Sequence, residues 1–146
     1  MRNYYIQIHD YLEKLVYSIM EIDRKGISFH GENLSINDIY ILKTLGNCQE
    51  KRLYEIIQEL KINRNILDPL VKRLYTSHYI VKKRDPQDKR VQILSLTDKG
   101  LDALKEITEK EKTTLYNLLN DFTFNEEKAI LKFLVKLDML YKKSDS

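Results

Sequence analysis

The sequence predicts a mainly α-helical protein that carries one small β-hairpin. Through most of the chain, apolar residues recur at the three- and four-residue spacing of one face of an α-helix. Only four Gly and two Pro interrupt the pattern, which favours long helices. Residues 80–84 and 91–96 differ: both are rich in Val, Ile and Leu, and the turn-forming segment 85–89 separates them, as in a hairpin.

Local signals mark where several helices begin and end. Ser35 followed by Asp38 predicts a capping box, and Thr97-Asp98 predicts a cap before the first helix that follows the hairpin. Gly26 and Gly31 mark a looser connection after the first helix. The expected helices cover residues 4–24, 36–45, 51–60, 63–77, 98–119 and about 123–142, the last beginning near Thr123 or Asn125.

The third short helix, residues 63–77, has one apolar and one polar face when its residues are projected at 100° intervals. The residues expected to be buried are Ile66, Leu67, Leu70, Val71 and Leu74. The opposite arc holds Asn65, Asp68, Pro69, Lys72 and Thr76, with Arg64 and Arg73 on its flanks. Asn and Arg can form the paired hydrogen bonds that distinguish adenine and guanine, and Lys reaches phosphate.

Pro69 leaves two interpretations of this helix open. A proline inside a helix lacks one hydrogen-bond donor and costs about 3 kcal/mol. In the alternative, Asp68 is the N-cap and Pro69 the first helical residue, which shortens the helix to little more than two turns. We prefer the longer helix, with a kink allowed, because Ile66 and Leu67 continue the apolar stripe.

Positive charge is concentrated in the middle of the chain. Residues 61–90 contain nine basic and three acidic residues, so this segment carries +6 while the whole chain carries only +3. The remainder is therefore at −3. Such a distribution suggests a polyanionic partner for the central segment, although a solvated surface is the alternative.

Three short helices followed by a hairpin give the order of a winged helix-turn-helix, in which the third helix enters the major groove and the hairpin is the wing. The sequence therefore predicts one domain, residues 1–146, with a DNA-binding lobe at about 34–98. The long terminal helices, residues 4–24 and 99–142, have apolar stripes too wide for so small a chain to bury alone. They suggest a dimerisation lobe and a homodimer.

The segment Asp85-Pro86-Gln87-Asp88-Lys89-Arg90, with the following Leu96-Thr97-Asp98-Lys99-Gly100, resembles the wing of the multiple-antibiotic-resistance regulator (MarR) family. That family has a D-x-R-D-x-R loop, an alternating strand and an L-T-x-x-G helix start, and its element order fits nearly the whole chain. The resemblance implies homodimers that bind palindromic operators. It further implies repressors that a small ligand or an oxidant releases.

The resemblance also implies roles for single residues. Arg90 matches the arginine that enters the minor groove, and Asp88 matches the acid that braces it. Gln87 stands where the family usually has a first wing arginine, which implies weaker minor-groove affinity. His78 replaces a frequent glycine, in a place that requires a left-handed backbone. Asn63, Arg64 and Asn65 match the first turn of the recognition helix.

Residues 67–74 resemble the peroxide-sensing and virulence-regulator branch, in which a proline occupies the same helix. That branch senses oxidants through a cysteine in its first helix, which this chain lacks. Cys48 falls between two short helices, and we expect an ordinary thiol there rather than a sensor. The tyrosines of the first helix are candidates for an aromatic effector pocket or, more commonly, for interface and core packing. The effector-binding residues are unknown.

We therefore expect a cytoplasmic, homodimeric regulator of transcription that binds double-stranded DNA and is not an enzyme. No cofactor, metal or membrane is expected, although a small-molecule effector is a candidate partner. The alternative is a winged helix that serves as a protein-interaction module or anti-repressor without specific DNA binding. The residues expected at the DNA are Asn63, Arg64, Asn65, Asp68, Lys72, Arg73, Lys83, Arg84, Asp88, Lys89 and Arg90.

Overall fold

The structure, a computed structural model, describes residues 4–46 and 49–144, and Cys48 lies outside them. The chain divides into two compact units, Met1–Lys105 and Glu106–Ser146. The predicted fold class is confirmed, since the described residues form six helices and two small antiparallel sheets. In chain order the elements are α1 (Tyr4–Lys25), β1 (Ile27–Phe29), β2 (Glu32–Leu34), α2 (Ile36–Leu45), β3 (Lys51–Arg52), α3 (Leu53–Leu60), α4 (Arg64–Thr76), β4 (Ile80–Arg84), β5 (Gln92–Leu96), α5 (Asp98–Leu119) and α6 (Phe124–Ser144).

The connection after α1 is a hairpin rather than the loose segment that the sequence predicted. β1 and β2 pair antiparallel, with Phe29 opposite Glu32, so His30 and Gly31 form a two-residue turn. Both turn residues have positive φ, 45° and 81°, as the tight turns that join two strands require. Strands of three residues are too short to show an alternating pattern, which explains why the sequence did not reveal them.

The capping box predicted for α2 is confirmed. The Asp38 amide donates to the Ser35 hydroxyl at 3.1 Å, and the Ser35 amide donates to the Asp38 carboxylate at 2.8 Å. α3 begins at Leu53 instead of residue 51, because Lys51 and Arg52 form a short strand, β3, that pairs with β5. β3 therefore places Arg52 beside β5, one of the two strands of the wing hairpin.

The long version of the recognition helix is confirmed: α4 includes Pro69 and is capped by Asn63, whose side chain accepts from the Ile66 amide at 3.0 Å. The predicted buried face is wrong at Ile66, which is 48% exposed. Leu67, Val71 and Leu74 are buried. The core-facing stripe is therefore centred one residue later in the helix than predicted, and Ile66 lies at its edge.

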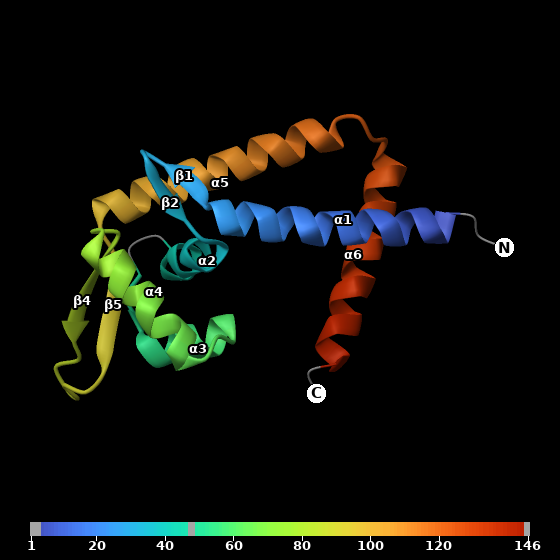
Figure 1. The fold of residues 1–146 in the computed structure, drawn as a ribbon. Helices are drawn as coiled ribbons and strands as arrows, with labels where there is room; N and C mark the ends of the chain where they lie inside the picture. The colour runs from blue at the N-terminus through green and yellow to red at the C-terminus, as the bar shows by residue number, and fades with distance from the viewer. Residues whose placement is uncertain (1–3, 47–48, 145–146) are drawn as a thin grey trace. The chain divides into compact units, whose positions relative to one another are not determined.

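β4 and β5 form the predicted wing, and their connecting turn projects from the helices in Figure 1. β5 is the central strand of a sheet of order β3-β5-β4, with Arg84 opposite Gln92 at the end next to the turn. The other end follows His78, whose φ of 67° is the left-handed conformation expected there.

The L-T-x-x-G motif fixes where the wing ends and α5 begins. The Thr97 hydroxyl donates to the His78 carbonyl and accepts from the Gly100 amide at 3.1 Å, so Thr97 caps α5. Gly100 lies so close to the Tyr79 carbonyl oxygen that a Cβ would overlap that oxygen. This position therefore requires glycine.

The second unit contains the remainder of α5 and all of α6. Thr123 and Glu126 form a capping box at the start of α6: the Thr123 amide donates to Glu126 at 2.8 Å, and the Glu126 amide donates to the Thr123 hydroxyl at 3.2 Å. The hydrogen bond from the Thr123 amide is the main cause that lowers the pKa of the Glu126 carboxyl. Within the described part of the chain, no helix combines the length and apolarity needed to cross a membrane.

Candidate nucleic-acid interface

α4 presents a polar and basic face to solvent. Asn65, Asp68, Pro69 and Lys72 are all exposed, and the Arg64 side chain is 69% exposed. Arg64 donates to Asp68 through Nε at 3.4 Å. An ion pair this exposed contributes at most about 1 kcal/mol, so Arg64 can exchange Asp68 for another acceptor at little cost.

Besides Arg64 and Asp68, two more of the residues predicted on this helix have partners within the protein. The side chain of Asn63 is the N-cap of α4. Arg73, at the other end, forms an ion pair with Asp38 of α2, a residue with no solvent exposure. Both residues are exposed, so their contact with DNA stays a prediction, but each also stabilises the fold.

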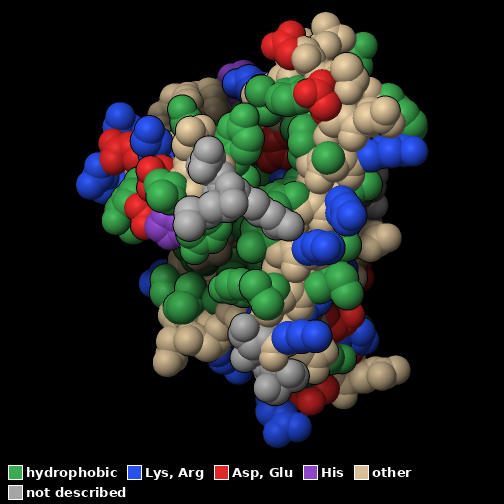
Figure 2. All heavy atoms as spheres, turned by 90° about the vertical axis from the view of Figure 1, so that its right-hand side faces the viewer, with side chains coloured by type: hydrophobic (Ala, Val, Ile, Leu, Met, Phe, Trp, Pro, Cys, Tyr) green, Lys and Arg blue, Asp and Glu red, His purple; other side chains and the backbone are tan. Residues whose placement is uncertain are grey.

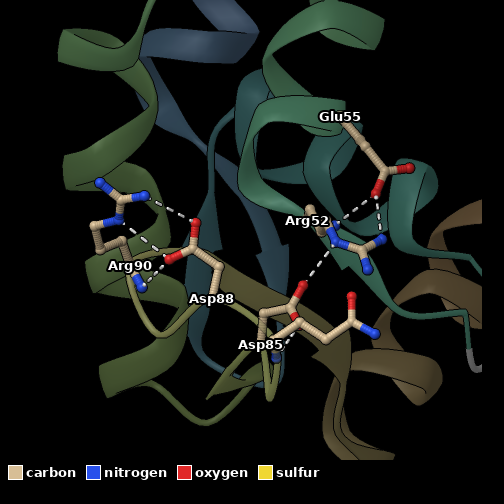
Figure 3. Close-up of polar contacts among 6 residues, drawn as sticks. Arg52, Glu55, Asp85, Asp88 and Arg90 are labelled. Carbon is tan, nitrogen blue, oxygen red and sulfur yellow. Dashed lines mark hydrogen bonds and ion pairs between the residues drawn. The ribbon is translucent and has the colours of Figure 1, made fainter.

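Arg90 projects from the wing turn into solvent, while Asp88 fixes its backbone amide and orients its guanidinium. Its side chain is 91% exposed. Asp88 contacts Arg90 as the resemblance implied, accepting from its amide and Nε at 3.1 Å and from Nη2 at 3.3 Å (Figure 3). These bonds lower the pKa of Asp88, so it remains an anion near neutral pH. The guanidinium is thus oriented without being buried.

The other basic residues predicted on the wing are also at the surface. Arg84 donates to the Lys89 carbonyl at 2.9 Å, which links the two sides of the turn. Lys83 and Glu50 form an ion pair at 2.6 Å in which both side chains are more than half exposed. The Lys89 side chain is exposed. The wing therefore offers several cations that a polyanion can reach.

Sequence reasoning missed two residues that fix this turn, Arg52 and Asp85. Asp85 is only 7% exposed and accepts from the Gln87 amide at 2.9 Å and from Arg52 Nε at 3.1 Å (Figure 3). The Gln87 amide and then Arg52 lower the pKa of Asp85, against the opposing effect of burial. The Asp85-Pro86 sequence is a known turn former and could have suggested the first contact. No sequence signal points to Arg52.

We assign no small-molecule or metal site among the described residues. Two open hollows on α1 are lined by residues of that helix alone, including Tyr4, Tyr11 and Tyr17. Within the described residues, ligand atoms of His9, Asp10 and Glu13 lie within 4.8 Å of one another, but all three residues are exposed. Exposed acidic groups at helical spacing are common, and we assign no ion to them.

The order α2, α3, α4 and then a two-stranded wing, with basic side chains on both α4 and the turn, defines a winged helix-turn-helix protein. Residues 26–107 match the family model of the transcriptional regulators SarA and Rot. The chain therefore belongs to the SarA/Rot family of transcriptional regulators. The winged-helix fold that the resemblance to MarR-type regulators implied is confirmed.

One curated protein and two solved structures are similar to this chain. The HTH-type transcriptional regulator SarZ of Staphylococcus epidermidis is 22% identical over 122 residues, which cover 82% of each chain. FabT of Streptococcus pneumoniae, solved in complex with DNA, has a TM-score of 0.81 at 21% identity over 95% of this chain and 98% of its own. PcaV of Streptomyces coelicolor, solved with its natural ligand, has a TM-score of 0.66 at 18% identity over 93% and 92%. These two structures share the fold, and the family confirms a regulator rather than an enzyme.

Proposed function

We propose that the protein binds double-stranded DNA sequence-specifically as a homodimer and represses transcription. The observation that carries this proposal is the exposed, braced guanidinium of Arg90 on the wing. Arg side chains of this kind favour a narrow minor groove, where the negative potential is strongest. The solved complex of FabT with DNA supports this use of the fold.

The bases would be read by α4. Arg64, Asn65, Asp68 and Lys72 lie on its exposed face, where a recognition helix contacts base edges. Lys83, Arg84 and Lys89 would neutralise phosphates beside the wing. A regulator of this kind works where the chromosome is, so we propose a cytoplasmic location.

The proposal of a homodimer rests on apolar surface. None of the residues of α1 is buried, although Tyr5, Ile8, Leu15 and Ile19 are among its large apolar side chains. On α6 most of the large apolar side chains are likewise exposed, and hydrophobic groups reach the surface widely in Figure 2. Apolar patches of this extent on a small chain mark an interface. We propose that residues 4–24 and 99–142 form it and that residues 34–98 bind DNA.

A small-molecule effector is part of the same proposal. PcaV was solved with its natural ligand, which supports ligand response in proteins of this fold. No residue of this chain is assigned to that ligand. Measuring DNA release while a panel of aromatic acids and oxidants is added tests this part separately.

Selection of bound sites from random DNA by the full-length protein tests the main proposal. We expect an inverted repeat whose half-sites are about one helical turn apart. Affinity for that DNA should fall steeply with salt, because each neutralised phosphate contributes about 0.9 to the slope of log affinity against log salt. If no DNA mobility shift is seen with the protein at low salt, the proposal is refuted and the protein-interaction module is favoured.

Arg90→Ala tests the wing. The variant should bind all sequences more weakly and show a slope shallower by about 0.9. Wild-type affinity in this variant would remove the wing from the DNA-binding surface.

A further inference from the structure

One ion pair ties the wing turn to the start of α3. Arg52 lies in β3, immediately before α3, and Asp85 lies at the first position after β4. Arg52 Nε donates to Asp85 Oδ2 at 3.1 Å, across 33 residues of sequence. In Figure 3 the two side chains point toward each other from separate elements.

Each partner is itself fixed by its own surroundings. The Arg52 amide donates to the Glu55 carboxylate in the first turn of α3 at 3.1 Å, and Arg52 pairs with Ile93 of β5. The Asp85 amide donates to the Val91 carbonyl at 2.9 Å, which closes the turn. The ion pair therefore joins two rigid points, the N-terminus of α3 and the neck of the wing turn.

The environment makes this contact stronger than an ordinary surface pair. Asp85 is 7% exposed, so little water competes for its carboxylate, while Arg52 is less than half exposed. Both carboxylate oxygens of Asp85 accept a hydrogen bond, Oδ1 from Gln87 and Oδ2 from Arg52. A buried carboxylate whose two oxygens both accept hydrogen bonds favours one arrangement of its donors. Removing one of those donors is costly, because the carboxylate oxygen stays buried without a partner.

We propose that Arg52 and Asp85 are positioning residues that hold the wing turn where Arg90 can enter the groove. The inference rests on the proposed DNA-binding function. Asp85 is an anion in a basic surface segment, so by Coulomb's law its charge opposes DNA binding. Any contribution it makes to affinity must therefore come through geometry, and this gives the test an unambiguous sign.

Asp85→Asn is the decisive variant because it keeps the shape of the side chain and removes its negative charge. Electrostatics alone predicts tighter DNA binding, whereas loss of positioning predicts binding weaker by about tenfold and a salt slope shallower by about 1. The measurement is fluorescence anisotropy at several salt concentrations, with the DNA selected as above. Affinity at or above the wild-type value would overturn the inference.

Glu50→Gln is the matched control. It also removes one negative charge next to the wing, but Glu50 is an exposed residue that forms an ion pair with Lys83 of β4, and the hydrogen bonds that Asp85 accepts come from Arg52 and Gln87. Unchanged or tighter binding is expected. If both variants weaken binding equally, the effect is not specific to Asp85 and the inference fails.

A double-mutant cycle with Arg90→Ala tests whether Asp85 acts through Arg90. If it does, the Asp85→Asn/Arg90→Ala double variant should bind like Arg90→Ala alone, because the contact that Asp85 positions is already absent. Losses that multiply would show that the two residues act independently, which contradicts the proposal.

Limited trypsin digestion gives a readout that needs no DNA. Cleavage after Lys89 and Arg90 should be faster in Asp85→Asn than in the wild type or Glu50→Gln, since a released turn opens more often. Arg52→Gln changes the more exposed partner of the ion pair and should give the same acceleration. It replaces Asp85→Asn in this test if Asp85→Asn folds poorly. Unchanged cleavage in both variants refutes the positioning role, whereas wild-type protein that binds no DNA refutes the proposed function instead.

Discussion

Asp38 of α2 and Arg73 of α4 form an ion pair whose acidic member has no solvent exposure. The same carboxylate oxygen accepts from the Ser35 amide in the capping box of α2. Among the described residues, the other oxygen of Asp38 is buried and accepts no hydrogen bond. Arg73 therefore compensates a buried charge and fixes the last turns of the recognition helix against α2.

Arg73→Gln should destabilise the fold by about 2–3 kcal/mol, because it leaves the Asp38 carboxylate buried without a cation. Lys72→Gln is the matched control on the same helix: its side chain is exposed, so we expect a stability change within about 0.5 kcal/mol. Urea unfolding followed by circular dichroism measures both. DNA binding should weaken directly in Lys72→Gln, and an Arg73→Gln variant of wild-type stability with reduced DNA binding would make Arg73 a DNA contact only.

Gly100→Ala should destabilise the protein by about 3 kcal/mol or prevent folding, because the new Cβ would overlap the carbonyl oxygen of Tyr79. The overlap involves backbone, which cannot move aside as a side chain could. Gly31→Ala is the comparison: nothing lies within 4 Å of its Cβ position, and only the φ of +81° opposes the change, at about 1 kcal/mol. Equal melting temperatures for the two variants would show that the contact with Tyr79 is not restrictive.

The features that could be predicted from the sequence are those that neighbouring residues determine. Both ends of a capping box lie three residues apart, as at Ser35 and Asp38, and a charged turn between two apolar strands identifies the wing. The exposed face of α4 followed from helical periodicity, except at Ile66. That error arose because the buried side chains further along α4 set the centre of the stripe.

The contacts that could not be predicted join residues that are distant in sequence. Arg52 meets Asp85 across 33 positions, and Arg73 meets Asp38 across 35. Several basic residues could have partnered either acid, and only the packing of β3 against β5 and of α4 against α2 decides between them. For that reason Arg73 was predicted to be a DNA contact without its internal partner, and Arg52 was not predicted at all.

Glu32 should make stability depend on pH in the acid range. Its carboxylate accepts from Lys99 Nζ at 2.8 Å and from the Tyr79 hydroxyl, and the hydrogen bond from Lys99 is the main cause that lowers its pKa. A lowered pKa in the folded state contributes stability above the unfolded pKa of about 4.3, and this contribution is lost as pH falls through the folded value. The neutral Glu32→Gln variant lacks this contribution.

The free energy of unfolding of the wild type should therefore exceed that of Glu32→Gln at pH 7, and the difference should shrink toward pH 3. Urea unfolding at the two pH values measures it. A difference that is constant or that grows on acidification would mean that the pKa of Glu32 is not lowered in the folded protein.

The apolar face of α6 provides the test of the homodimer. Leu134 is 52% exposed and lies on the same arc of the helix as Ile130, Leu137 and Tyr141, whereas Lys136 lies on the opposite side. Leu134→Gln should shift the protein toward a monomer in analytical ultracentrifugation, since an amide buried in an apolar interface loses its water without gaining a partner. Lys136→Gln introduces the same side chain on the polar face and should leave the mass of the assembly unchanged.

Because a palindromic site needs two recognition helices, the monomeric variant should also bind DNA much more weakly, although it retains every predicted DNA-contacting residue. A monomeric Leu134→Gln variant that still binds the inverted repeat with full affinity would separate DNA recognition from dimerisation.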